Sequence, residues 1–319
     1  MTIISARKPH RVFILCASLA AVLGASIASA AAPNPDEWTM PGGDYAMTRH
    51  STLSDINTQN VAHMQMAWSM STSATRGHEG QPLVIGNMMY YVTAYPNYVW
   101  ALDLSKADNY QVVWKYSPKQ DDHAVAVACC DTVNRGLSYA DGKLVFNTLD
   151  GQVVALDAKT GKEVWKVKRV DPQKGETSTP APIIVKDVVI SGMGGDEFGV
   201  RGRLQAFSLK DGHALWTCQS TGSDKDVCLS KGFNKAHPEY GQLGDLGLKS
   251  WPGDEWKRGG GAPWGWITYD PKLDLIYYGT GNPSTWSPSY RCKYKTSAEC
   301  NNGTQDNKWS LSLIARNAS

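Results

Sequence analysis

The stretch Ala155-Leu-Asp-Ala-Lys-Thr-Gly-Lys-Glu-Val-Trp165 reads as the end of one strand, a glycine turn and a second strand that carries a tryptophan. Two related segments are Ala101-Leu-Asp103, before Trp114, and Ala206-Phe-Ser-Leu-Lys-Asp-Gly-His-Ala-Leu-Trp216. With Trp68, the tryptophans are spaced by 46, 51 and 51 residues. Repeats of this length are typical of propeller blades. The repeat therefore predicts an all-β fold, a β-propeller.

Each repeat supplies short strands separated by tight turns. In one repeat we expect strands over 143–148, 152–156 and 163–166, with turns at Asp150-Gly151 and Thr160-Gly161. This pattern predicts four-stranded antiparallel blades. The glycine before each tryptophan permits a left-handed turn, and the indole can then lie on the backbone of the adjacent blade. Tryptophan in a strand is also common in ordinary cores, so the period carries the prediction.

The first 30 residues have the pattern of a secretory signal peptide. Arg7, Lys8 and Arg11 precede an apolar run, and the small residues Ala28-Ser-Ala30 form a typical cleavage site at its end. We expect cleavage near Ala30, a mature chain over 31–319, and a secreted, periplasmic location. No later apolar run reaches the length of about 18 residues that a membrane span needs, so no transmembrane anchor is expected.

The charge balance gives no reason to expect a nucleic-acid partner. The formal net charge is +2, and the signal peptide holds three basic residues and no acidic one. The mature chain is therefore close to neutral, without the strong positive charge of a nucleic-acid-binding protein. A charged fraction of 19% with 12 Trp and 14 Tyr is typical of an aromatic-rich extracellular β protein.

The cysteines form three close pairs once Cys16 leaves with the signal peptide: Cys129 with Cys130, Cys218 with Cys228, and Cys292 with Cys300. Three local disulfides are the simplest hypothesis, although six cysteines allow 15 connectivities. Adjacent α-carbons lie about 3.8 Å apart, below the usual disulfide window of roughly 4.4–6.8 Å. A vicinal bridge would therefore be strained, as functional sites often are. The alternative is two unrelated thiols.

The last residues, 308–319, read as a strand followed by the opening of another repeat. We therefore expect residues 31–319 to be a partial propeller domain of about four blades, truncated within a repeat. A natural short product is the alternative.

Five further blocks are distinctive in their order along the chain: Gly77-His-Glu-Gly-Gln-Pro82, Val127-Ala-Cys-Cys-Asp-Thr-Val-Asn-Arg-Gly136, Gly195-Asp-Glu-Phe-Gly-Val-Arg-Gly202, Gly259-Gly-Gly-Ala-Pro-Trp-Gly-Trp266 and Tyr278-Gly-Thr-Gly-Asn-Pro283. With the repeats and the signal peptide, they resemble the large subunit of the quinoprotein alcohol dehydrogenases, most closely the methanol dehydrogenases. The resemblance implies an eight-bladed propeller that holds pyrroloquinoline quinone (PQQ).

The resemblance implies a flat site for this cofactor. Cys129 and Cys130 would form one wall and Trp264 the other, because a rigid wall and a stacking ring hold a planar group at low entropic cost. The cofactor's carboxylates and carbonyls would meet the following groups: Arg135, Thr179, the backbone of Gly194, Gly195 and Asp196, and the nearby Glu79. The alternatives are core packing for Trp264 and a structural ion pair for Glu79 and Arg135.

Glu197 and Asn282 match the metal ligands of the family. Their oxygens suit a hard cation, calcium or a lanthanide, and the Ala262-Pro-Trp264 variant leads us to favour the lanthanide branch. Turn chemistry in Gly281-Asn-Pro283 is the alternative for Asn282. Asp196 departs from the small residue expected before the metal-binding glutamate, so its side chain is left unassigned.

The implied reaction is oxidation of a primary alcohol to the aldehyde, with electrons leaving to a periplasmic cytochrome c. The catalytic aspartate of the family is expected beyond Ser319, so no catalytic residue is assigned and the chain alone is expected to be inactive. A homodimer or an associated small subunit is the expected assembly. The alternatives are a dehydrogenase for ethanol, longer alcohols or polyols, and a non-catalytic periplasmic scaffold. The segment 292–305 resembles an insertion that a Cys292–Cys300 bridge would staple.

Overall fold

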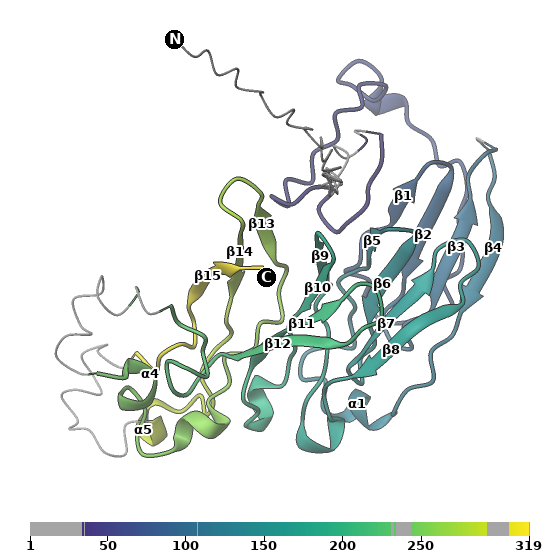
Figure 1. Ribbon diagram of the computed structural model, residues 1–319. Helices are drawn as coiled ribbons and strands as arrows, with labels where there is room; N and C mark the ends of the chain where they lie inside the picture. Colours follow the sequence, from purple (N-terminus) through teal and green to yellow (C-terminus); the bar gives the residue numbers. More distant parts are fainter. Residues whose placement is uncertain are drawn as a thin grey trace, which may run out of the picture. The chain divides into compact units, whose positions relative to one another are not determined.

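The computed structural model describes Asn34 and residues 36–106, 108–230, 233, 244–291 and 306–318. The chain divides into two units, residues 1–32 and 33–319. The expected signal peptide lies outside the described residues. The described part of the second unit contains four antiparallel sheets (Figure 1), three with four strands and one with three.

The strands follow the order of the chain within every sheet. The first two sheets comprise β1 (Leu83–Ile85), β2 (Met88–Val92), β3 (Val99–Asp103) and β4 (Gln111–Tyr116), then β5 (Ser138–Ala140), β6 (Lys143–Asn147), β7 (Gln152–Asp157) and β8 (Glu163–Lys168). The next two comprise β9 (Ile183–Val185), β10 (Val188–Ser191), β11 (Arg203–Ser208) and β12 (Ala214–Gln219), then β13 (Thr268–Asp270), β14 (Leu275–Gly279) and β15 (Leu313–Asn317).

Short helices occupy the connections between strands and sheets. They are η1 (Val61–His63), α1 (His123–Ala126), η2 (Pro172–Lys174), η3 (Asp196–Phe198), α4 (Leu246–Lys249), η4 (Glu255–Arg258) and α5 (Pro288–Arg291).

The sheets confirm the predicted all-β propeller blades. The middle strands β6 and β7 are almost wholly buried, whereas four of the six residues of β8 are exposed and Trp165 is the one buried residue of that strand. The pairing of third and fourth strands shifts register at Ala101/Leu102, Ala155/Leu156 and Ala206/Phe207. The same irregularity in three sheets is the structural counterpart of the sequence repeat.

Apolar cores lie between successive sheets, which stand side by side in Figure 1. Leu83 of the first sheet and Phe146 of the second belong to one cluster. Val153 of the second sheet and Phe207 of the third belong to another, and Ile190 of the third sheet joins Ile276 of the fourth. Each sheet therefore buries its faces against its neighbours, as propeller blades do.

The repeated tryptophans join one sheet to the next, as predicted. Nε1 of Trp114 donates to the Ala158 carbonyl at 3.1 Å, and Nε1 of Trp165 donates to Leu209 at 2.9 Å. Trp216 makes the same bond to Ala318 at 3.2 Å. Gly161 has a φ of 69°, and a Cβ there would lie 2.6 Å from the Trp114 ring. The Trp114 indole therefore packs directly against the Gly161 backbone, where a larger residue would clash with the ring.

Trp68 shares the spacing of the other tryptophans but not their place in a strand of the described residues. No strand includes Trp68, and its ring lies 4.7 Å from that of Tyr110. A strand needs a hydrogen-bonded neighbour, and the described part of the chain offers none here.

Two of the three predicted disulfides are present. Cys129 bonds to Cys130, with α-carbons 3.8 Å apart, and Cys218 bonds to Cys228, with α-carbons 5.6 Å apart. The Cys292–Cys300 pair lies outside the described residues. The vicinal pair lies between α1 and β5, in the segment that connects the first sheet to the second.

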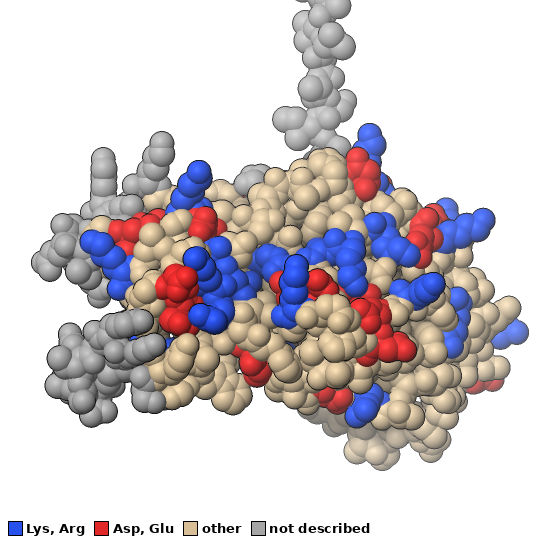
Figure 2. Space-filling model, turned by 90° about the horizontal axis from the view of Figure 1, so that it is seen from below, with Lys and Arg blue, Asp and Glu red and all other residues tan. Residues whose placement is uncertain are grey.

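Among the described residues, no helix has the length and apolar character required for a membrane span. On the face shown in Figure 2, Lys and Arg side chains lie beside Asp and Glu side chains across its middle. The described residues form several ion pairs, for example Arg201 with Asp226 at 2.8 Å and Arg258 with Glu255 at 3.0 Å.

Candidate functional site

A cavity of about 400 Å³ is lined by loops that connect successive sheets and by loops that connect strands within a sheet. All eleven residues predicted for the cofactor and metal site line it: Glu79, Cys129, Cys130, Arg135, Thr179, Gly194, Gly195, Asp196, Glu197, Trp264 and Asn282. They come from six separate segments, so the fold gathers at one place residues that are up to 203 positions apart.

The vicinal disulfide and an indole contribute the apolar surface of this cavity. Cys129 and Cys130 are exposed, and Trp264 is 47% exposed although its neighbours Ala262 and Ile267 are buried. An aromatic ring left uncovered inside a cavity is available for stacking. Trp264 is therefore no core residue, whereas the nearby Trp266 is partly buried and donates from Nε1 to the Arg135 carbonyl at 3.4 Å.

Arg135 is the one guanidinium among the residues that line the cavity. Its Nη1 donates to Oγ1 of Thr179 at 2.8 Å, and its Nη2 lies 3.0 Å from Oε2 of Glu79. The guanidinium also lies over the Trp264 ring, 5.0 Å from the ring centroid. Burial lowers the pKa of Arg135, and the charge of Glu79 opposes that shift. The side chain is thus a nearly buried cation, and its contacts with Thr179 and Glu79 fix the orientation of the guanidinium.

A glycine-rich backbone borders the cavity beside Thr179. Gly194 and Thr177 pair as an isolated bridge, with N to O distances of 2.9 and 3.3 Å. Gly195 has a φ of 124°, and a Cβ there would lie 2.5 Å from the Gly175 carbonyl oxygen. Only glycine fits this position without distortion, and its small size leaves the backbone open to the cavity.

Asp196 is almost fully buried, with 2% of its surface exposed. Its Oδ1 accepts a hydrogen bond of 2.6 Å from the Ala262 backbone N–H. Burial raises the pKa of Asp196 to about 7, the Ala262 hydrogen bond opposes the rise, and the charge of Glu197 adds to it. The side chain therefore points into the protein, toward the Ala262 loop.

Glu197 and Asn282 bring oxygen donors to the same cavity. Glu197 is exposed in η3, and the backbone carbonyl of Asn282 accepts from Gly261 N at 3.0 Å, which fixes its loop. Nδ2 of Asn282 is buried and has no hydrogen-bond partner. A buried amide without a partner costs free energy, so this side chain has bonding capacity that a bound group could satisfy.

Within the described residues, no cluster of three or more His, Cys, Asp or Glu side chains is arranged to hold a metal ion. The donors available are carboxylate and amide oxygens, which suit hard cations. This set fits a metal whose coordination is completed by a bound cofactor. The guanidinium, the uncovered indole and the open glycine backbone fit a flat anionic cofactor.

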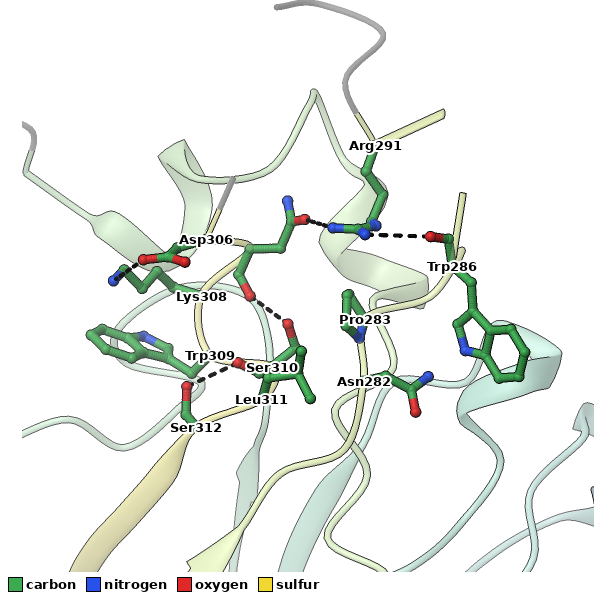
Figure 3. A pocket seen from close by; sticks show the side chains of 11 residues that line it. Asn282, Pro283, Trp286, Arg291, Asp306, Lys308, Trp309, Ser310, Leu311 and Ser312 are labelled. Atoms are coloured by element: carbon green, nitrogen blue, oxygen red, sulfur yellow. Dashed lines mark hydrogen bonds and ion pairs between the residues drawn. The ribbon is translucent and has the colours of Figure 1, made fainter. Parts of the chain in front are cut away.

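A second hollow of about 660 Å³ adjoins the cavity and shares Asn282 and Trp286 with it. In Figure 3, Asn282 and Trp286 lie on one side of this hollow and Lys308 and Trp309 on the other. Its polar side chains bind one another, for example Arg291 Nη1 with Asn307 Oδ1 at 2.7 Å. The smaller cavity is the better candidate site, because all eleven predicted residues line it, whereas Asn282 is the one predicted residue that lines the larger hollow.

Five residues that line the cavity were not predicted: Ala128, Asp131, Val133, Thr177 and Trp286. Three of them had a signal in the sequence. Asp131 directly follows the cysteine pair, Thr177 is two residues before Thr179 on an extended segment, and Trp286 is four residues after Asn282.

The fold and the site together define a quinoprotein-type propeller, and comparison with known proteins supports this class. Residues 38–315 match the family model described as "Glucose/ethanol/alcohol dehydrogenase, beta-propeller domain". A lanthanide-dependent methanol dehydrogenase of Methylacidiphilum fumariolicum is 54% identical over 88% of this chain. Subunit 1 of the methanol dehydrogenase [cytochrome c] of Methylorubrum extorquens is 47% identical over 89% of the chain.

A solved structure, a europium-containing methanol dehydrogenase, is 52% identical, covers 90% of this chain and superposes with a TM-score of 0.82. The chain belongs to the family of PQQ-dependent methanol dehydrogenases. It spans 44% of the length of the two curated relatives and 47% of the solved chain.

Proposed function

We propose that this chain forms the PQQ-binding and metal-binding part of a quinoprotein that oxidises methanol or another primary alcohol to the aldehyde. One observation carries the proposal. A single cavity is lined by the vicinal disulfide, the uncovered Trp264, the buried guanidinium of Arg135 and the unpaired amide of Asn282. The disulfide, the indole, the guanidinium and the Asn282 N–H donor complement a flat anionic quinone, and the oxygens of Glu197 and Asn282 in the same cavity suit a hard cation.

Each group has a definite role in this proposal. Arg135 would hold an oxygen of the cofactor through its guanidinium, which Glu79 and Thr179 keep in place. The disulfide and the Trp264 indole would hold the flat ring system and exclude water from it. Gly194 and Gly195 would let the cofactor approach the backbone closely because neither carries a side chain, and the bridge between Gly194 and Thr177 would hold this backbone in place.

Glu197 and Asn282 are proposed to bind the metal ion. With the groups bound, alcohol oxidation would use the quinone as the two-electron acceptor and the cation as a Lewis acid. We propose a lanthanide, because the 54% identical relative is named as lanthanide-dependent and the superposed structure contains europium. Calcium is the alternative. The proton acceptor for the alcohol is expected outside the sequence of these 319 residues.

Methanol is the proposed substrate because the relatives described above are named as methanol dehydrogenases. Ethanol, longer alcohols and polyols remain the alternatives. A periplasmic cytochrome c is the proposed electron acceptor, since the Methylorubrum relative carries cytochrome c in its name. The same name, subunit 1, motivates a small partner subunit, with a homodimer as the other candidate assembly. Export by the signal peptide over 1–30 would place the protein in the periplasm.

The proposal is tested by titrating PQQ into the purified chain with europium or calcium present and following tryptophan fluorescence. We expect saturable binding with one PQQ per chain, and loss of binding in Glu197→Ala and Asn282→Ala. We expect no dye reduction by the chain with a series of alcohols, because no residue that lines the cavity is assigned as the proton acceptor. A folded chain that binds no PQQ would contradict the proposal and favour the scaffold alternative.

A further inference from the structure

Asp196 is a buried carboxylate whose contacts reach two other loops of the site. Its Oδ1 accepts the Ala262 N–H at 2.6 Å, a short hydrogen bond between buried groups. Ala262 is two residues before Trp264, and Asp196 is directly before Glu197. One hydrogen bond therefore ties the segment of the proposed metal ligand Glu197 to the segment that carries the indole wall.

The second oxygen of Asp196 lies against the third segment. A Cβ added to Gly281 would lie only 2.2 Å from Oδ2 of Asp196, so the carboxylate packs directly on the Gly281 backbone. Gly281 N in turn donates to the Ala262 carbonyl at 3.0 Å. Gly281 is directly before Asn282, the other proposed metal ligand. The three segments thus meet at Asp196.

We propose that Asp196 is a positioning residue, which fixes the loops of Glu197, Trp264 and Asn282 relative to one another through the Ala262 amide. The role in metal binding rests on the proposed function, whereas the anchoring itself does not. Direct binding of the ion by Asp196 is the competing role. The contacts favour anchoring, because Oδ1 is engaged by Ala262 and Oδ2 is packed on Gly281.

The first test needs no cofactor. Hydrogen exchange of the Ala262 amide is compared in the wild-type chain, Asp196→Asn and Asp196→Ala. Asparagine keeps an acceptor oxygen and alanine does not, so we expect exchange within about threefold of wild type in the first variant and at least about tenfold faster in the second. Unchanged exchange in Asp196→Ala would overturn the anchoring role.

The second test measures europium affinity by luminescence in the presence of PQQ. We expect Asp196→Ala to bind europium about tenfold more weakly, with more water on the ion, and Asp196→Asn to stay close to wild type. An equal loss in both variants would overturn the proposal, since charge or direct ligation would then be the cause.

The matched control is Asp157, another carboxylate that accepts a backbone N–H, from Thr160 at 2.8 Å in the β7–β8 turn. Asp157→Ala should leave europium affinity unchanged, and an equal loss there would show that the Asp196 effect is a general loss of structure. If the wild-type chain binds neither PQQ nor europium, the proposed function fails, and the exchange of the Ala262 amide still decides the anchoring role.

Discussion

Nη2 of Arg135 lies 3.0 Å from Oε2 of Glu79, and the two side chains differ in burial, at 11% and 42% exposed. The arginine is therefore the enclosed partner, and the glutamate is the one that solvent reaches. With Thr179 on its other side, the guanidinium is held within the cavity by contacts from two distant segments. In the proposed site, this cation faces the cofactor.

Replacement of Arg135 by lysine should weaken PQQ binding even though the charge is kept. Lysine cannot make the paired donor geometry of the guanidinium, and loss of a charged hydrogen bond costs about 1.5–3 kcal/mol, or roughly 10- to 100-fold in affinity. Titration of the Arg135→Lys chain with PQQ measures this. Arg316, which lies over Tyr278 away from the cavity, provides the control Arg316→Lys. Wild-type affinity in Arg135→Lys would refute the assigned role.

The two disulfides should have separate effects. Removal of the vicinal pair in Cys129→Ala/Cys130→Ala should reduce PQQ affinity by about fivefold, because a preorganised wall is lost. Removal of Cys218–Cys228, which closes a loop with a sequence separation of 10, should lower the free energy of unfolding by about 2–3 kcal/mol and leave PQQ affinity unchanged. PQQ titrations and urea unfolding curves of both double variants measure the two effects. If removal of Cys218–Cys228 lowers PQQ affinity and removal of Cys129–Cys130 does not, the vicinal disulfide is not a wall of the PQQ site.

Gly212, whose backbone packs against the Trp165 indole, should not tolerate a side chain. Its φ is 76°, and a Cβ would lie 2.6 Å from the indole. Gly212→Ala should therefore lower the free energy of unfolding by about 2–4 kcal/mol, from backbone strain and overpacking. Gly142 is the matched control, because its φ is 70° and no atom lies within 4 Å of an added Cβ. Urea unfolding of Gly142→Ala should show only the strain, about 1 kcal/mol, and equal losses would show that the contact with Trp165 is unimportant.

The buried ion pair of Glu176 and Arg203 should make part of the stability depend on pH. Two contacts of 2.8 and 2.9 Å join them. Burial raises the pKa of Glu176, but the hydrogen bonds and charge of Arg203 outweigh burial, so the pKa is lowered below 4.5. A lowered carboxyl pKa contributes stability above the unfolded pKa and loses it as pH falls through the folded value. Unfolding curves should show the largest difference between wild type and Glu176→Gln near pH 7 and a smaller one below about pH 4; a difference that grows toward acid pH would contradict this sign.

The sequence could predict the blades because a local pattern fixes them. The turn glycine and the tryptophan of each repeat are few residues apart and therefore visible as a repeat, although each indole docks on the turn of the next sheet, as at Trp114, Trp165 and Trp216. Trp68 belongs to the same spacing but lies in no strand of the described residues. Spacing alone does not reveal whether a neighbouring strand is present to pair with its segment.

The candidate site could be predicted only as a set of residues, through resemblance to a family. Its packing could not, because the deciding contacts join residues far apart in the chain. Asp196 binds an amide 66 positions away, and nothing near it in the sequence indicates that partner. Trp286 was likewise missed because its place at the cavity depends on how the loop after Asn282 folds.

A crystal structure of the chain with PQQ and europium would test the central claim most directly, since anomalous scattering locates the ion. The account predicts one europium peak within roughly 2.3–2.6 Å of oxygens of Glu197 and Asn282, with PQQ between the disulfide and Trp264. An empty cavity, or europium bound only in the hollow beside Lys308, would contradict it.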